Sequence, residues 1–413
     1  MRTKIFVLLA VLALLLGTVT PALAQDTAGS EPPVFCGNLA KEDCDILQKS
    51  HDLMKQVAQS TSLTTFDVTL NGIPGLPAET INAEITSNTT SVADPAAMAA
   101  VQKLAGLSQE ETLQLLADDP QPIIDLVSGW DVDMTLDVAV TPELADLISA
   151  QSGLQVPDQL AIQAKLVDGV LYWDLSEVAA FVPTIAAGWV GFPLLDMMNE
   201  LVKQGAFEQA LQASQAQGAA GAGGVTVAGL GSAQFIQQYA ETFQKYMTIE
   251  SGEVITLNGQ PAAPFTTTMD LAGFLSGPDF QQIVVDLAKQ GAFEGTGLTA
   301  ADIEQNIQML GMMGPMLFTG MTATAKQTIG LDDLLLYEYE SEVAWDMSGL
   351  VQMAAASGQL PAELQPTSDN VGFDIKTAIS NSDMSTEATT TVEAPADAQM
   401  IPLESVLNAM TAQ

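Results

Sequence analysis

The residues that most often perform catalysis or bind metals are scarce in this chain. It has a single histidine, His51, and two cysteines, Cys36 and Cys44. A Ser-His-Asp triad, a Cys-His pair or a zinc site needs these residues in a recognisable arrangement, and no G-x-S-x-G, zinc, phosphate-loop or calcium-loop motif is present. We therefore predict a non-enzymatic protein with no catalytic residue, metal or cofactor. We interpret His51 as a residue at the edge of the apolar face of the helix that is predicted to begin at Lys41.

Carboxylates are the one abundant group that could do chemistry. The chain has 50 acidic residues against 12 basic ones, and its formal net charge is −38. A carboxylate pair can hydrolyse a glycosidic bond, but these residues follow no motif, so solvated surface charge is favoured over a hydrolase. Nucleic acids and anionic lipid surfaces are recognised with Lys and Arg, and Arg2 is the only arginine. We expect no nucleic-acid partner.

The two cysteines predict a local disulfide. Cys36 and Cys44 are eight positions apart in a short acidic stretch. Redox-active pairs usually have the closer C-x-x-C spacing, which is absent. The bridge is expected to restrain the N-terminal segment.

The N-terminus has the pattern of an export signal. Arg2 and Lys4 precede an apolar run that ends at Leu16, and Ala22-Leu23-Ala24 is a typical cleavage site. An uncleaved anchor is the alternative, but the run is short against the roughly 20 residues that span a bilayer. We expect a periplasmic or extracellular protein, without a stable transmembrane segment after cleavage.

The remaining chain is predicted to be one domain. Residues 1–24 form the signal peptide, 25–40 a flexible leader, and 41–413 a single half-barrel α+β domain. The uncharged run from Val178 to Leu195 contains two prolines and two glycines, so it predicts a turn and a short strand. A lid or membrane-touching loop is the alternative for this run.

Several hairpins can be predicted from turn residues. Asp168-Gly169 and Asn258-Gly259 each separate two strand-like runs. Three strand-like runs end in an aspartate, Asp174, Asp270 or Asp346, and each is expected to cap the helix that follows. This repetition is compatible with an internal duplication, or with the same strand-to-helix connection arising independently at three places.

The stretch Gly320 to Met347 predicts a long hairpin with one solvent-exposed face, which we call the wet face. Its return strand places three glutamates on one side and aromatic or apolar residues on the other: Glu338, Glu340 and Glu342 against Tyr337, Tyr339, Val343 and Trp345. Such alternation is typical of an antiparallel sheet with one solvated face. We predict an α+β fold in which a strongly curved antiparallel sheet (a half-barrel) has helices packed on its concave face.

This arrangement resembles the LolA/LppX-like bacterial lipoprotein-carrier superfamily. The resemblance rests on a pattern spread over most of the chain: the helix and two strands of Lys41 to Thr90, Leu166 to Tyr172, Trp189-Val190, Met321 to Trp345 and Val392 to Ala398. It implies an apolar cavity between sheet and helices that binds acylated lipids or lipoproteins. The chain differs from that family in lacking an arginine that could gate the cavity and a cysteine that could carry a lipid anchor.

We expect an apolar ligand, such as a lipid or an acyl chain, in that cavity. Methionines cluster between 309 and 321, and their flexible side chains suit acyl chains. The predicted cavity residues are Trp173, Met309, Met312, Met313, Met316, Phe318, Tyr339 and Trp345. The alternatives are that the methionines fill an ordinary core, and that the protein is a cell-surface or matrix protein without a small-molecule ligand.

Overall fold

The computed structural model describes residues 34–73, 78–104, 107, 109–152, 155–182, 185–205, 239–289, 314–316, 318–356 and 370–404. The predicted signal peptide therefore lies outside the described residues. In the described part of the chain, no helix is long and apolar enough to cross a membrane.

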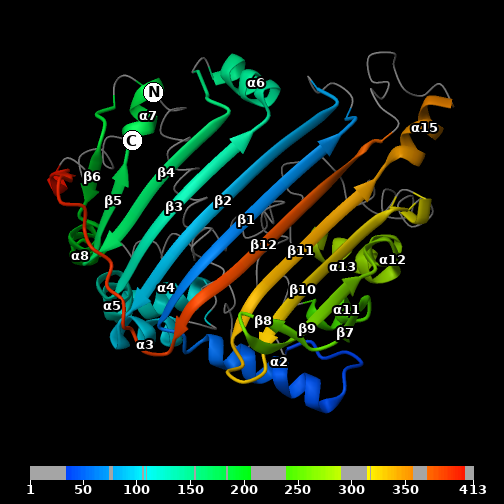
Figure 1. Cartoon of the computed structure of the whole chain (residues 1–413), viewed down its shortest axis with the longest axis horizontal. Coiled ribbons are helices and arrows are strands. Elements are labelled where there is room, and N and C mark those ends of the chain that lie inside the picture. The colour runs from blue at the N-terminus through cyan, green and yellow to red at the C-terminus, as the bar shows by residue number, and fades with distance from the viewer. Residues whose placement is uncertain are drawn as a thin grey trace.

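One large open sheet dominates the molecule (Figure 1). The N-terminal strands are β1 (Gln59–Asn71), β2 (Thr80–Ala93), β3 (Trp130–Val140), β4 (Gln159–Val167), β5 (Val170–Asp174) and β6 (Trp189–Phe192). The C-terminal strands are β7 (Met247–Ser251), β8 (Ile255–Leu257), β9 (Gln260–Met269), β10 (Met321–Gly330), β11 (Leu336–Asp346), β12 (Gly372–Ser385) and β13 (Gln399–Met400). The predicted α+β class with an unclosed sheet is confirmed.

Helices connect the strands. They are α2 (Lys41–Met54), α3 (Pro95–Leu104), α4 (Gln109–Asp118), α5 (Gln121–Gly129), α6 (Pro142–Ser152), α7 (Ser176–Phe181), α8 (Leu194–Lys203), α11 (Ala240–Gln244), α12 (Leu271–Ser276), α13 (Pro278–Lys289) and α15 (Ser348–Ala356). Helices α3 to α5 link β2 to β3 and gather near one end of those strands (Figure 1).

The strand order places the first strand in the middle of the sheet. Neighbours follow the order β13-β6-β5-β4-β3-β2-β1-β12-β11-β10-β9-β7, with β8 beside β9. Strand β1 pairs antiparallel with β2 and with β12, so two meanders from opposite ends of the chain meet there. The β1–β12 pair therefore joins the N-terminal and C-terminal halves into one sheet.

The strand register separates two faces. Phe66 is paired with Ile85 on β2 and with Thr377 on β12, and Ile85 packs against the cluster of buried residues on β3 and β4. We call the face with Phe66 the inner face. Residues one position along each strand, such as Asp67, belong to the outer face.

Apolar clusters cover the two flanks of the inner face. On the N-terminal flank, buried side chains of β3 and β4 form one cluster: Val132, Met134, Leu136, Ile162 and Ala164. On the C-terminal flank, Leu47 of α2 packs with Phe265 and Ile329. Phe274 of α12 and Ile283 of α13 form a further cluster that contacts Met269 of β9.

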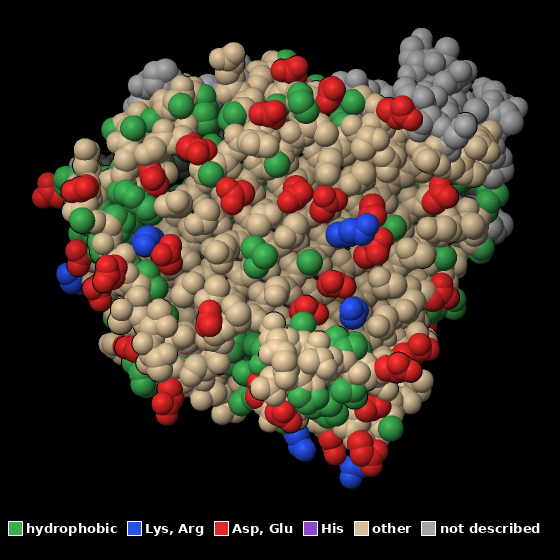
Figure 2. Space-filling model, viewed as in Figure 1, with side chains coloured by type: hydrophobic (Ala, Val, Ile, Leu, Met, Phe, Trp, Pro, Cys, Tyr) green, Lys and Arg blue, Asp and Glu red, His purple; other side chains and the backbone are tan. Residues whose placement is uncertain are grey.

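The outer face is polar, as predicted for the hairpin. Glu338, Glu340 and Glu342 pair with Ser380, Ala378 and Lys376, whose side chains are exposed. Figure 2 shows the sheet from the side turned toward the viewer in Figure 1, where acidic side chains are spread among uncharged polar ones. The predicted wet face of the hairpin is confirmed.

The predicted disulfide is present between Cys36 and Cys44. Val34, Phe35 and Leu39 around it pack against the cluster that contains Leu47, so the end of the expected leader takes part in core packing. The physical reason is composition, because three apolar side chains within six residues favour burial once the bridge holds them against α2.

The predicted turns adopt left-handed backbone conformations. Asp168 and Gly169 have φ of 49° and 74°, and Asn258 and Gly259 have 53° and 81°. These values match the two-residue turns expected from Asp-Gly and Asn-Gly. Both hairpins, β4–β5 and β8–β9, are confirmed.

The three strand-ending aspartates bind the start of the next helix. Asp270 caps α12 by accepting a hydrogen bond from the Gly273 N–H at 2.8 Å. Asp174 and Asp346 accept one from the N–H of the serine two positions later, each at 2.9 Å. The bonds from Ser348 lower the pKa of Asp346. The expected helix cap is therefore confirmed at Asp270, whereas Asp174 and Asp346 bond the first residue of the next helix from one position before its cap.

The sheet is antiparallel, as predicted, except at one edge. Strand β13 pairs with β6 in parallel, through Gln399 with Val190 and Met400 with Gly191. The reason is the segment of residues 386–398, which we call the strap. It runs from the end of β12 past the ends of the N-terminal strands to β6 (Figure 1). A strand that arrives by such a crossover is free to pair in parallel, whereas a tight hairpin imposes antiparallel pairing.

Gln59 holds the start of the strap. Its side chain is buried, and its Oε1 accepts hydrogen bonds from Thr389 N at 2.9 Å and Thr390 N at 2.8 Å. The Thr389 hydroxyl donates to the same oxygen at 3.2 Å. Further along the strap, Val392 is buried against Val92 and Val167.

Replacement of Gln59 by leucine should therefore destabilise the protein. Three donors on the strap would lose their acceptor. We therefore expect the free energy of unfolding, measured by urea denaturation, to fall by about 1–3 kcal/mol. Gln163→Leu, at an exposed position of β4, is the matched control and should change stability little. Equal midpoints for Gln59→Leu and wild type would contradict the role of Gln59.

The turn between β10 and β11 generates a pH prediction. The Tyr337 hydroxyl donates to Asp333 at 2.6 Å, and this bond raises the pKa of Tyr337 to about 12. Since the folded pKa exceeds the usual value of about 10, the stabilisation is complete below pH 10 and is lost as the pH rises through 12. An ultraviolet absorbance titration of the folded protein should lose its step near pH 12 in Tyr337→Phe and keep it in Tyr339→Phe.

Candidate ligand-binding face

The centre of the inner face is less buried than its flanks. Phe66 on β1 is 37% exposed, although it lies on the face that carries the apolar clusters. Its inner-face neighbours Val68 and Thr64 on β1, and Ile375 and Ile379 on β12, are only partly buried. A partly exposed aromatic residue between two buried clusters makes the centre of this face the best candidate for a binding surface.

Polarity changes along the inner face of β1. Towards one end, Val68 and Leu70 pair with Ala83 and Ile81 on β2 and with Ile375 and Phe373 on β12. We call this the apolar end. Towards the other end, the inner side chains of β1 and β2 carry hydroxyl groups, and we call this the hydroxyl end. Its residues are Ser60, Ser62, Thr64, Ser87, Thr89 and Ser91. Phe66 lies at the boundary between the two ends.

The charged residues of the central strands lie on the outer face. In the rows from Ser62 to Leu70, the Asp, Glu and Lys residues of β1, β2, β11 and β12 all alternate away from Phe66. They are Asp67, Glu84, Glu338, Glu340, Glu342, Asp374 and Lys376. The Lys376 ammonium is bound to the Asp374 carboxylate at 2.8 Å, and this interaction raises the pKa of Lys376. The central inner face is therefore uncharged in an otherwise strongly acidic protein.

Aromatic packing closes the apolar end. The ring of Trp345 lies 5.8 Å from that of Phe318 and 6.0 Å, edge to face, from that of Phe373, measured between centroids. Phe373 in turn pairs with Leu70 of β1. The indole Nε1 of Trp345 is buried without a hydrogen-bond partner, which is consistent with an environment that lacks polar groups.

The described members of the predicted cavity set do not lie together. Trp173 on β5 packs against the cluster on β3 and β4, whereas Trp345 on β11 contacts Phe318. Six strand spacings separate β5 from β11, which corresponds to roughly 29 Å along the sheet. Tyr339 is on the inner face between Gln327 and Ile379, near the centre.

The methionine segment is described only in part. Met309, Met312 and Met313 lie outside the described residues. Met316 is 42% exposed and belongs to a short turn of helix that precedes Phe318. The proposed role of this segment as a cavity lining therefore stays a prediction.

A second feature is a surface depression of about 520 Å³ beside α3 and α4. It is lined by Lys103, Leu107, Glu111, Gln114, Leu115 and Asp118.

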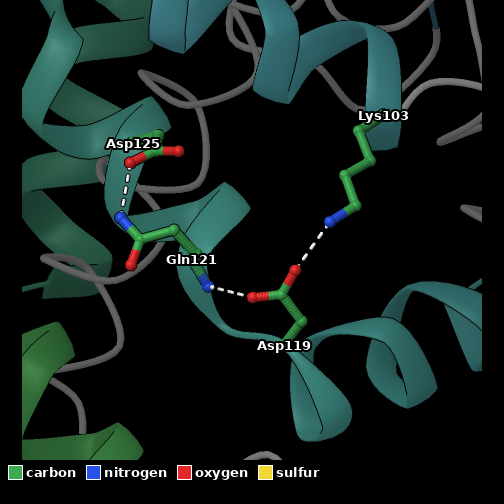
Figure 3. A network of polar contacts seen from close by, with 4 residues as sticks. All are labelled: Lys103, Asp119, Gln121 and Asp125. Carbon is green, nitrogen blue, oxygen red and sulfur yellow. Dashed lines mark hydrogen bonds and ion pairs between the residues drawn. The ribbon is translucent and has the colours of Figure 1, made fainter.

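A polar network lies beside this depression. Figure 3 shows that the Lys103 ammonium donates to Asp119, at 2.7 Å, while the Gln121 N–H donates to the other carboxylate oxygen at 3.2 Å. Both bonds lower the pKa of Asp119. The Gln121 side chain in turn donates to Asp125 at 2.5 Å. The lining combines the apolar side chains of Leu107 and Leu115 with charged and polar residues, and Lys103 among them is already paired with Asp119.

Sequence reasoning missed Phe66 and the hydroxyl end as candidate site residues. The signal was present in the alternation of residues 60–70, where Ser, Ser, Thr, Phe, Val and Leu occupy every second position. It was ambiguous because the opposite face of β1 is also mixed, with Leu63 beside Asp67 and Thr69. Only the pairing of Phe66 with Ile85 shows which face adjoins the core.

The aromatic contacts of Trp345 generate a stability prediction. Trp345→Ala should lower the free energy of unfolding by about 3 kcal/mol, because contacts with Phe318 and Phe373 would be lost and a cavity left. Glu340→Gln, five positions earlier on the outer face, should be nearly silent because its side chain is largely exposed and its ion pair with Lys326 is long, at 4.0 Å. Thermal or urea denaturation of both variants measures the difference, and equal stabilities would contradict the assignment of faces.

Comparison with known proteins identifies no family. No protein-family model matches the chain, and no curated protein sequence matches it. A DUF1329 family protein from Desulfovibrio piger has 7% identity and a TM-score of 0.16, covering 84% of this chain and 92% of that one. A β-barrel-like protein of domain of unknown function DUF1849 from Brucella abortus has 8% identity and a TM-score of 0.13, covering 78% and 98%. Scores this low establish neither a shared fold nor a shared function.

Proposed function

We propose that this protein is an exported, non-enzymatic binding protein whose inner sheet face holds the acyl chain of a lipid-like ligand. The single observation that carries the proposal is the partial exposure of Phe66 in the middle of that face. Covering an exposed aromatic ring with a hydrocarbon chain is favourable, at about 25 cal/mol per Å² of apolar surface removed from water. The disulfide between Cys36 and Cys44 is compatible with the export part of the proposal.

A comparison within β1 shows why exposure at Phe66 differs from ordinary surface exposure. Leu63 is even more exposed, at 47%, but it lies on the outer face between Asn88 and Ser380. Phe66 lies between Ile85 and Thr377, with Val68 next along its own face. A hydrocarbon chain at Phe66 would therefore meet further apolar side chains, whereas one at Leu63 would meet polar neighbours.

The second candidate is a cell-surface or matrix protein without a small-molecule ligand. The observation in its favour is that buried clusters already fill both flanks of the inner face. Such a protein would need the sheet only as a scaffold for its acidic outer face. The two candidates differ in whether purified protein carries, or takes up, a lipid.

Native mass spectrometry of the exported protein, purified without detergent, tests the proposal directly. We expect a mass increment from bound lipid that disappears after organic extraction. Protein that carries no lipid and does not bind a fluorescent fatty-acyl probe added at micromolar concentration would refute the proposal and favour the surface-protein alternative.

Two variants of β1 provide the matched test. Phe66→Ser should weaken binding of the fluorescent acyl probe at least tenfold, because it removes the exposed aromatic surface from the inner face. Leu63→Ser removes a side chain of similar exposure from the outer face and should leave probe binding unchanged. Equal effects of the two substitutions would show that the probe does not occupy the inner face.

A further inference from the structure

The inner face changes from polar to apolar along the direction of β1. From Thr64 to Leu70, β1 rises about 20 Å, and along this distance its inner side chains change from hydroxyl-bearing to apolar. One leaflet of a bilayer contributes about 15 Å of hydrocarbon, half of the roughly 30 Å core, so a single long acyl chain fits this length. The face therefore matches an amphiphile laid along β1.

Some hydroxyl groups are available to a ligand and others are not. Ser60 and Ser91 bond each other at 3.1 Å, and Ser87 bonds Thr89 at 3.1 Å. Ser62 and Thr64 lie on β1 directly opposite Thr89 and Ser87, and both residues are partly exposed. Each hydroxyl can both donate and accept, which suits esters and alcohols.

A buried donor without an acceptor lies on the same end of the inner face. The indole Nε1 of Trp130, at the start of β3, is buried and has no hydrogen-bond partner. Trp130 shares the inner alternation of Val132 and Met134 and pairs with Ala93, one residue beyond Val92 of β2. Trp130 is two strands from β1 and four residues beyond the row of Ser62, Thr89 and Met134, so a headgroup at Ser62 and Thr64 does not reach it.

The distribution of charge decides between classes of headgroup. No lysine lies on the inner face of the central strands in the described rows, and the chain carries a formal charge of −38. A carboxylate or phosphate headgroup would lose its hydration here without gaining a cationic partner. An uncharged headgroup avoids that cost.

From these observations, and resting on the proposed function, we infer that the ligand is a neutral single-chain amphiphile such as a monoacylglycerol. Its hydroxyl and ester groups lie at Ser62 and Thr64, and its acyl chain extends past Phe66 toward Leu70. The headgroup is held by neutral hydrogen bonds, so binding varies little with salt concentration.

Competition binding with two ligands of equal chain length tests the headgroup. A monoacylglycerol and the corresponding fatty-acid anion displace the fluorescent acyl probe at pH 8, below their aggregation concentrations. We expect the monoacylglycerol to bind at least tenfold more tightly. Equal affinity, or preference for the anion, would overturn this inference while leaving the proposed function intact. Failure of both ligands and of the probe to bind would overturn both.

Variants of neighbouring residues test the placement of the headgroup. Thr64→Val keeps the shape of the side chain, removes one neutral hydrogen bond and should weaken monoacylglycerol binding about fivefold. Thr65→Val makes the same change on the outer face and should have no effect. If Ser62 compensates in the single variant, Ser62→Ala combined with Thr64→Val should still weaken binding. Unchanged affinity in the folded double variant, with its fold checked by thermal melting, would overturn the placement.

Discussion

The pairing of β1 with β12 is the interaction on which the rest of the structure depends. It pairs residues from opposite ends of the chain, such as Gln59 and Ser385, and it joins two meanders that would otherwise each end in an open edge. Exposed edges invite pairing with other chains, so this contact also protects the fold. Closing so long a connection has an entropic cost that grows only slowly with length, and a pairing that extends along both strands offsets it.

The same pairing creates the candidate site. Strands β1 and β12 contribute the central inner rows, from Ser62 and Asn381 at one end to Leu70 and Phe373 at the other. The cluster on β3 and β4 belongs to the N-terminal half alone, whereas the cluster on the C-terminal flank also includes Leu47 of α2. The partly exposed centre likewise needs both halves. The position of the candidate face between two packed clusters is therefore a consequence of the topology.

Charge in this protein is organised by strand alternation. The outer face combines carboxylates with a few lysines, for example Glu340 with Lys326 at 4.0 Å, and such exposed pairs contribute little to stability. Their main effect is to keep one face hydrated, which leaves the other face for apolar side chains. Because side chains alternate with a period of two, acidity concentrated on one face permits an uncharged surface on the other.

Much of the fold could be predicted from local signals in the sequence. Asp-Gly and Asn-Gly set turns because they tolerate left-handed backbone, the strand-ending aspartates bind the next helix through short-range hydrogen bonds, and the glutamates of β11 identify the wet face. The disulfide joins cysteines close enough in sequence to meet in one turn and a helix. Each of these features depends on residues a few positions apart, so sequence patterns are sufficient.

The candidate face and the sheet edge depend on contacts that no local pattern contains. The alternation of side chains in β1 defines two faces, but each face carries both polar and apolar residues. Only the pairing of Phe66 with Ile85 shows that the face with Phe66 is the inner one. Likewise, Trp173 and Trp345 look equivalent in sequence, while the strand order separates them by six positions. The parallel pairing of β13 follows from the path of the strap. Tertiary structure decided these features because strand partners hundreds of residues apart are chosen by the whole chain at once.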